Sequence, residues 1–278
     1  MRGEFVDVGG ARLYYYAAGT RGAGEPLVLI HGLFTSSHLW AGVVACLPLG
    51  HRTIILDHLG HGRSDPPPTD AALGIAGHAD RTLALLDALG VRRACLVGHG
   101  LGAEVAQAIA IAHPARVTRL ALINAGALGT ERALAGRLLR ALIPSAGALP
   151  GPLLLGALRR RLAAGYLDAD RGARAIDHYL RPFTAPTGRD VVVAQLKALA
   201  DEDDGALADG LSQITVPTMV ATGIADPIAT PAVADALGAR IAGATVESIG
   251  HVGHYAPDES PEHTMRVIRH LLERPLEH

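Results

Sequence analysis

Hydrophobic residues along this chain alternate between short apolar runs and longer stretches with helical spacing. The runs typical of buried strands are Pro26–Ile30, Arg52–Leu56, Ala94–Val97, Val117–Ile123, Thr218–Thr222 and Thr245–Ile249. The stretches with helical spacing include Leu39–Leu47, Ala72–Leu89, Leu101–Ala112 and Pro261–Leu272. Phe5–Val8 and Arg12–Ala17 read as an opening hairpin joined by Gly9 and Gly10. The pattern predicts an α/β fold, with a mostly parallel eight-stranded sheet covered by helices on both faces.

The alternation stops between residues 126 and 211, where no strand pattern occurs. This stretch holds amphipathic segments rich in Leu, Ala and Arg, and prolines interrupt them. We expect a helical cap inserted after the sixth strand, with residues 1–125 and 212–275 forming the α/β core. The acidic run Asp201–Asp204 is interpreted as a solvated surface. Residues 276–278 resemble the start of a vector-encoded histidine tag and are excluded.

Composition narrows the possible partners of the protein. The 278 residues carry a net charge of −2, which favours neither nucleic acid nor an anionic membrane. We expect no membrane-spanning segment and no signal peptide, because no apolar run is long enough, and hence a cytoplasmic protein. Cys46 and Cys95 stand far apart in unlike contexts, which argues against a disulfide framework. We expect a small apolar organic substrate, no cofactor and no metal.

A glycine-rich turn follows the strand Ala94–Val97. The sequence Gly98-His99-Gly100-Leu101-Gly102 runs from that strand directly into a helix. Flanking glycines allow a very sharp turn, which presents the middle residue above the sheet at the helix N-terminus. Gly-x-Ser-x-Gly, the nucleophile elbow, has this form. Here the middle residue is Gly100, which has no side chain with which to attack a substrate.

Two later motifs follow the elbow in a meaningful order. Asp226 comes after a strand, in Thr222–Pro227, and His254 lies in Gly253-His254-Tyr255-Ala256-Pro257. The order elbow, aspartate, histidine is that of a hydrolase triad. An Asp226–His254 pair would fix the imidazole tautomer and provide a general base near neutral pH. His251 is three residues before His254, but no third ligand is evident, so no metal site is predicted.

An upstream loop supplies the remaining candidate groups. His31-Gly32-Leu33-Phe34 follows the strand Pro26–Ile30, where backbone N–H groups can form half of an oxyanion hole. Leu33 and Leu101 are the predicted pair of N–H donors. The further candidate oxyanion or substrate-binding residues are His31, Gly32, Phe34 and His99. We expect His99 to pack or hydrogen-bond beside the elbow.

Taken together, these motifs resemble the α/β-hydrolase superfamily along nearly the whole chain. The similarity is greatest to the branch of haloalkane dehalogenases, epoxide hydrolases and C–C or ester hydrolases. The matching stretches are His31-Gly32 with Thr35–Trp40, Asp57–Asp65, the elbow, Asp226 and Gly253-His254. The resemblance implies an aspartate or a serine where Gly100 stands. Dehalogenases also tend to carry tryptophan at the position of Leu101 and a polar residue at that of Leu33, so dehalogenation is disfavoured.

Three hypotheses follow from the missing nucleophile. The first is a non-covalent enzyme that uses the His–Asp dyad and oxyanion hole for cyclisation, elimination, isomerisation or water addition on a carbonyl-bearing, natural-product-like metabolite. The second is a conventional hydrolase whose Ser or Asp was changed to glycine in the laboratory. The third is a non-catalytic ligand-binding homologue. Thr35, Ser36 and Ser37 are interpreted as turn and capping residues, and Cys95 as a buried structural thiol.

Overall fold

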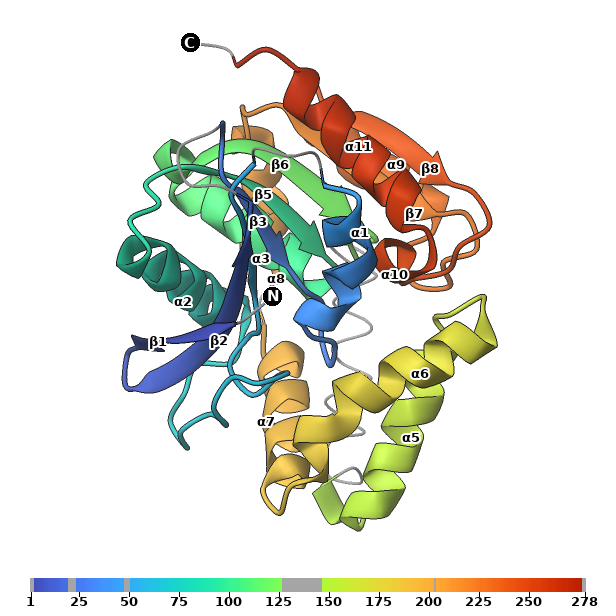
Figure 1. Cartoon of the computed structure of the whole chain (residues 1–278). Helices are drawn as coiled ribbons and strands as arrows, with labels where there is room; N and C mark the ends of the chain where they lie inside the picture. Colours follow the sequence, from blue (N-terminus) through green and yellow to red (C-terminus); the bar gives the residue numbers. More distant parts are fainter. Residues whose placement is uncertain (1–2, 20–23, 48–50, 127–146, 203, 277–278) are drawn as a thin grey trace.

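The computed structural model describes residues 3–19, 24–47, 51–126, 147–202 and 204–276 (Figure 1). These residues form an eight-stranded sheet in the order β1-β2-β4-β3-β5-β6-β7-β8. The strands are β1 (Glu4–Val8), β2 (Ala11–Ala18), β3 (Leu27–Ile30), β4 (Thr53–Leu56), β5 (Ala94–His99), β6 (Val117–Ile123), β7 (Thr218–Gly223) and β8 (Thr245–Ile249). The β1–β2 and β2–β4 pairs are antiparallel, and all other pairs are parallel. The predicted mostly parallel sheet is therefore confirmed.

Helices cover both faces of the sheet because successive side chains of each strand point in opposite directions. In β3, Val28 and Ile30 belong to the apolar cluster shared with α2, α3 and α9. Leu27 and Leu29 belong to the cluster shared with α1 and α11. The bounds of these helices are α1 (Ala41–Ala45), α2 (Ile75–Ala88), α3 (Leu101–Ala112), α9 (Pro231–Gly238) and α11 (Pro261–Glu273), with the short α10 (Ala256–Glu259) preceding the last.

Two helix starts differ from the sequence-based prediction. The segment predicted as one helix from Leu39 is a 3-10 turn, η1 (Ser37–Trp40), that continues into α1, and Ser36 caps it by accepting from the His38 N–H. Helix α2 begins at Ile75 rather than Ala72, and the Glu202 carboxylate accepts its Ile75 N–H. The prediction of a solvated acidic run is thus wrong for Glu202, because this side chain satisfies an amide of α2.

Helices fill the described part of the segment between β6 and β7, and no strand occurs there. They are α5 (Gly151–Ala163), α6 (Ala169–Leu180), η3 (Arg181–Thr184), α7 (Gly188–Ala200), α8 (Asp204–Gly210) and η4 (Leu211–Gln213), together with η2 (Pro114–Arg116) before β6. Figure 1 shows α5, α6 and α7 gathered at one end of the sheet. Residues 127–146, 203 and 277–278 of the predicted segments lie outside the described residues, and the domain boundaries stay a prediction. Within the described chain, no helix has the length and apolar character needed to cross a membrane.

The turn between β5 and α3 leaves no room for a side chain at Gly98 or Gly102, two residues before and after Gly100. A Cβ atom at Gly98 would collide with the carbonyl oxygen of Gly102, and one at Gly102 would lie 2.6 Å from the carbonyl oxygen of His31. Glycine at both positions therefore lets α3 start directly against β3 and its following loop. Gly100 itself adopts φ 53° and ψ −121°, a conformation that other residues rarely take.

Four histidines, His31, His58, His61 and His78, form a buried cluster in the interior, with their rings tilted or edge-on to one another. The ring centroids of His31 and His58 are 4.5 Å apart, as are those of His58 and His78, and those of His31 and His61 are 5.3 Å apart. Burial lowers the pKa of His31, His61 and His78 to about 3 and also lowers that of His58. These four rings are therefore neutral at physiological pH. Among the described residues, no group of three or more His, Cys, Asp or Glu side chains has a metal-binding arrangement.

We predict that Gly98→Ala lowers the free energy of unfolding by roughly 1–3 kcal/mol, because the added methyl group overpacks the turn. Urea denaturation followed by circular dichroism measures this. Gly156→Ala in α5 is the matched control, since its added Cβ has no heavy atom within 4 Å apart from its chain neighbours and the nearby backbone of its own helix. Equal stability of the two variants would contradict the close approach at Gly98.

We also predict a loss of stability in acid that originates in the buried histidines. The folded-state pKa of about 3 lies below the ordinary value of 6.5, so the unfolded chain binds more protons between these two pH values. The contribution of these histidines to the free energy of unfolding is complete above pH 6.5 and is lost progressively as the pH falls toward 3. Urea titrations at several pH values give the free energy of unfolding as a function of pH. Between pH 6.5 and 3, this free energy should fall less steeply for His78→Gln than for the parent chain. Identical slopes would show that His78 does not contribute.

Candidate active site

Gly100 lies at the tip of the elbow and faces a histidine from a distant part of the chain. A Cβ atom built on Gly100 would lie 3.7 Å from Nε2 of His254 and 3.7 Å from the Cα of Gly32. Both distances correspond to ordinary van der Waals contact. A side chain at position 100 would therefore point at the imidazole and at the loop after β3, and glycine places none there.

His254 and Asp226 form a hydrogen-bonded pair beside the elbow. Nδ1 of His254 lies 2.9 Å from Oδ2 of Asp226, whose side chain is fully buried. A carboxylate at this position accepts the Nδ1 proton, so the lone pair of a neutral imidazole lies on Nε2. The pair predicted from the order of the motifs is therefore brought together, and its Nε2 faces Gly100.

Asp226 is held as a charged acceptor by several donors. Its Oδ1 accepts from the N–H groups of Ile228 at 2.7 Å and Ala229 at 3.0 Å, and its Oδ2 accepts from Nδ2 of Asn124 at 2.7 Å. Burial by itself would raise the pKa of Asp226, but the hydrogen bonds from His254, Ile228 and Asn124 outweigh burial and lower it to about 2. The carboxylate is therefore ionised at neutral pH.

Sequence reasoning missed Asn124. It is the first residue after β6, and its side-chain amide donates to Asp226. Its backbone adopts the left-handed conformation, with φ 47°. A polar residue at the carboxyl end of a parallel strand is the signal that could have found it, because such ends meet at one edge of the sheet.

The loop that carries His254 is anchored from three directions. Nε2 of His99 donates to the carbonyl oxygen of His254 at 2.7 Å, and the N–H of His254 donates to the carbonyl oxygen of Gly165 in the cap at 2.7 Å. Glu259 accepts from the N–H of Gly253 at 2.9 Å through one oxygen and from that of Leu167 at 2.7 Å through the other. The carboxylate of Glu259 thus links the backbone of the cap to that of the His254 loop.

His99 was predicted among the oxyanion or substrate-binding residues. The structure places its ring in the interior, at 1% exposure, with Nε2 on the backbone of His254. Burial lowers the pKa of His99 to about 3, so its ring stays neutral. The observed contact is a hydrogen bond beside the elbow, and it holds the loop of His254 in position.

The two predicted oxyanion donors lie on adjacent segments. Leu101 is the first residue of α3, and Leu33 lies in the loop after β3, whose Gly32 Cα is beside the elbow. In the described part of the chain, neither N–H donates to a backbone or side-chain acceptor. The two amides stay a predicted pair of donors for a carbonyl oxygen.

The first residues of this loop have structural contacts. His31 is fully buried, its Nδ1 donates to the carbonyl oxygen of Gly32 at 2.7 Å, and its Nε2 accepts from the N–H of His58. Phe34 is also buried, with φ 55°, and its ring packs edge-on against Phe183 of the cap. These contacts fix the backbone from which the Leu33 amide projects.

No other nucleophile takes the place of the missing side chain among the described residues. The hydroxyl of Thr35 donates to the carbonyl oxygen of Gly32, and that of Ser36 caps η1. Cys95 is fully buried inside β5, and burial raises its pKa. In the described residues, no side chain is hydrogen-bonded to Nε2 of His254.

Comparison with known proteins gives a consistent assignment. A family model described as alpha/beta hydrolase fold matches residues 25–144. A putative carbamate hydrolase, RutD, of Variovorax paradoxus is 34% identical over 238 residues, which cover 83% of this chain and 85% of the relative. The crystal structure of the enol-lactonase from Burkholderia xenovorans LB400 is 26% identical, covers 98% of this chain and 100% of its own, and has a TM-score of 0.78.

A second solved structure is Est816, described as an N-acyl homoserine lactone degrading enzyme. It is 29% identical, with a TM-score of 0.76, and the match covers 96% of this chain and 99% of that one. The family model, the relative and the solved structures agree with the fold of the eight-stranded sheet. The chain therefore belongs to the α/β-hydrolase fold family.

Proposed function

We propose that this protein is a non-covalent acid/base enzyme that acts on a small acyl compound. The observation that carries the proposal is that Nε2 of His254 faces Gly100, a residue that offers no nucleophilic atom. A base oriented by Asp226 is retained at this site, whereas the group from which it would ordinarily take a proton is absent. The base is then free to take a proton from the substrate or from water.

The chemistry needs two groups that act together. The N–H groups of Leu33 and Leu101 would hold the carbonyl oxygen of the substrate and stabilise negative charge on it. His254 would remove a proton from a carbon next to that carbonyl, or from a water molecule that adds to it. The same proton returns from Nε2 to the product, so no bond to the enzyme forms. Cyclisation, elimination, isomerisation and water addition all follow this course.

The substrate class is inferred from the relatives and from the cap. The names of the similar proteins mention carbamates, lactones and enol-lactones, all of which carry an acyl carbonyl. The cap contributes apolar residues such as Leu158, Leu162 and Phe183 to the cluster that packs against this end of the sheet. An acyl carbonyl on a small, mostly apolar skeleton fits both observations.

A covalent hydrolase whose attacking residue was replaced is the second candidate. It is favoured by the space at position 100, since a Cβ atom there makes only ordinary contacts. A serine on that Cβ would place its hydroxyl near Nε2 of His254. The two candidates predict different reactions for a variant that carries a hydroxyl at position 100.

We predict that His254→Gln lowers turnover by about 10²–10⁴-fold, because the general base is lost while the cap and elbow remain. The assay incubates the enzyme with a panel of lactones, carbamates and esters and detects products by mass spectrometry. His251→Gln is the matched control on the same loop, since its exposed side chain has no contact with the dyad. Equal turnover in the His254 variant would remove the dyad from the mechanism. Saturable binding without any product would indicate a ligand-binding protein instead.

We predict that Gly100→Ser creates a nucleophile that a fluorophosphonate probe labels at one site per chain, because the new hydroxyl lies beside the oriented imidazole. Intact-mass spectrometry measures the labelling. Gly100→Ala supplies the same Cβ without the hydroxyl and should stay unlabelled. If ester hydrolysis also rises far above that of the parent chain and the parent's own reaction is absent, the covalent alternative is favoured. An unlabelled Gly100→Ser variant would contradict the geometry described for the elbow.

A further inference from the structure

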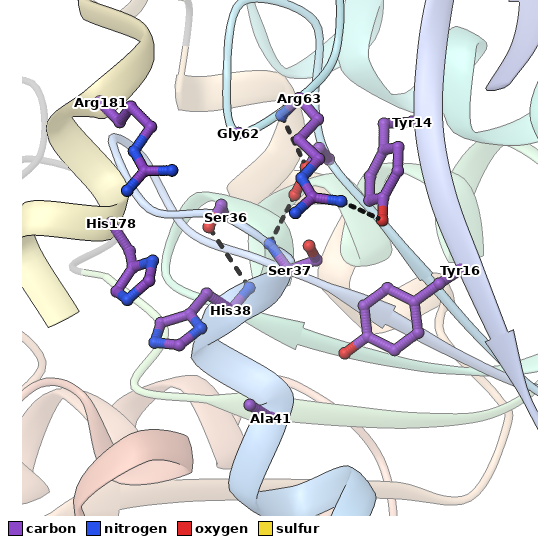
Figure 2. A pocket seen from close by; sticks show the side chains of 11 residues that line it. Tyr14, Tyr16, Ser36, Ser37, His38, Ala41, Gly62, Arg63, His178 and Arg181 are labelled. Carbon is purple, nitrogen blue, oxygen red and sulfur yellow. Dashed lines mark hydrogen bonds between the residues drawn. The ribbon is translucent and has the colours of Figure 1, made fainter. Parts of the chain in front are cut away.

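A cavity of about 330 Å³ opens between the cap and the core. Its size falls within the range of roughly 300–1,000 Å³ that is typical of small-molecule pockets. It is lined by Tyr14, Tyr16, Ser36, Ser37, His38, Ala41, Asp57, Gly62, Arg63, His178 and Arg181 (Figure 2). None of the dyad, elbow or oxyanion residues lines this cavity, so it is separate from the proposed active site.

Two arginines reach the cavity from opposite sides. Arg63 belongs to the loop after β4, and Arg181 starts η3 at the end of the cap helix α6. Nη1 of Arg63 donates to the hydroxyl of Tyr14 at 3.0 Å. Within the described ranges, neither guanidinium is ion-paired with a carboxylate, and the guanidinium of Arg181 has no hydrogen bond. Figure 2 shows the Arg63 guanidinium bonded to the hydroxyl of Tyr14, and Arg181 with His178 on the other side of the cavity.

Asp57, the carboxylate that lines the cavity, already accepts hydrogen bonds from the backbone. Asp57 is 1% exposed, and its two oxygens accept from the N–H groups of Ser37 at 2.6 Å and Arg63 at 2.9 Å. It therefore neutralises one positive charge at the floor of the cavity while its oxygens are held by the backbone. Among the residues that line the cavity, two guanidinium groups stand against one carboxylate, which leaves an excess of positive charge.

Two histidines stack across the same junction. His38 comes from η1 of the core and His178 from α6 of the cap, with ring centroids 4.2 Å apart and an interplanar angle of 25°. No ring nitrogen of either has a hydrogen-bond partner among the described residues. Burial and the neighbouring His178 lower the pKa of His38, whereas Asp258 acts in the opposite direction. An anion placed against both rings would favour their protonated forms.

We propose that this cavity binds the phosphoryl group of a small molecule and thereby bridges cap and core. Arg63 and Arg181 supply forked donors that match phosphate oxygens, and His38 and His178 supply further N–H donors from a third direction. A tetrahedral dianion accepts from donors that surround it, whereas a planar carboxylate with one charge does so less well. The space beside Tyr14, Tyr16 and Ala41 leaves room for an organic body attached to the phosphoryl group.

The test is calorimetric titration of the full chain with inorganic phosphate, phenyl phosphate and benzoate at constant ionic strength. We expect saturable one-to-one binding of both phosphates and at least about tenfold weaker binding to Arg181→Gln, since a charged hydrogen-bonded contact is lost. Arg174→Gln changes an exposed arginine of α6, the helix that leads into η3, outside the cavity; it is the matched control and should bind like the parent.

Each outcome decides the proposal. If phenyl phosphate binds more tightly than inorganic phosphate, the ligand is an organic phosphate. If the two bind equally, the ligand is free phosphate. Both results support the phosphoryl site. Benzoate binding more tightly than either phosphate overturns the phosphoryl assignment. Absent phosphate binding, or equal affinity in the parent and Arg181→Gln, overturns the site. Circular dichroism of Arg181→Gln and Arg174→Gln establishes that both variants are folded.

Discussion

At the start of α3, the backbone of Gly102 packs directly against the carbonyl groups of Ile30 and His31. This contact sets the first amide of α3 beside the loop that carries Leu33, and it also fixes where position 100 points. A larger residue at 102 would push the helix away from β3 and separate the two N–H groups. The geometry of the elbow therefore depends on a steric constraint that holds whatever residue occupies its tip.

The histidine side of the site depends on the cap as well as on the core. The backbone of His254 is held by Gly165 of the cap and by His99 of the elbow, and Glu259 joins both segments. A shift of the cap would therefore also move the imidazole. The junction where α6 meets η1 includes the basic cavity at Arg181, so an anion bound there would act on the same contact between cap and core.

Several polar residues owe their role to partners far away in the sequence. Glu202 looked like part of a solvated acidic run, yet it accepts from Ile75, which is 127 positions earlier. Asn124 carries no motif, yet it donates to Asp226. Asp57 matched a family motif, and only the structure shows that its oxygens serve the backbone of Ser37 and Arg63. A hydrogen bond needs a specific distance and direction, which local sequence does not encode.

The sequence by itself determined the parallel sheet, the helices on its two faces and the order of elbow, Asp226 and His254. It could do so because strand and helix periodicity and sharp glycine turns are local properties of the chain. The tertiary structure decided that Nε2 of His254 faces Gly100 and that Arg63 and Arg181 share one cavity. Those facts arise where segments distant in sequence pack together, and packing is settled by the whole fold rather than by any one segment.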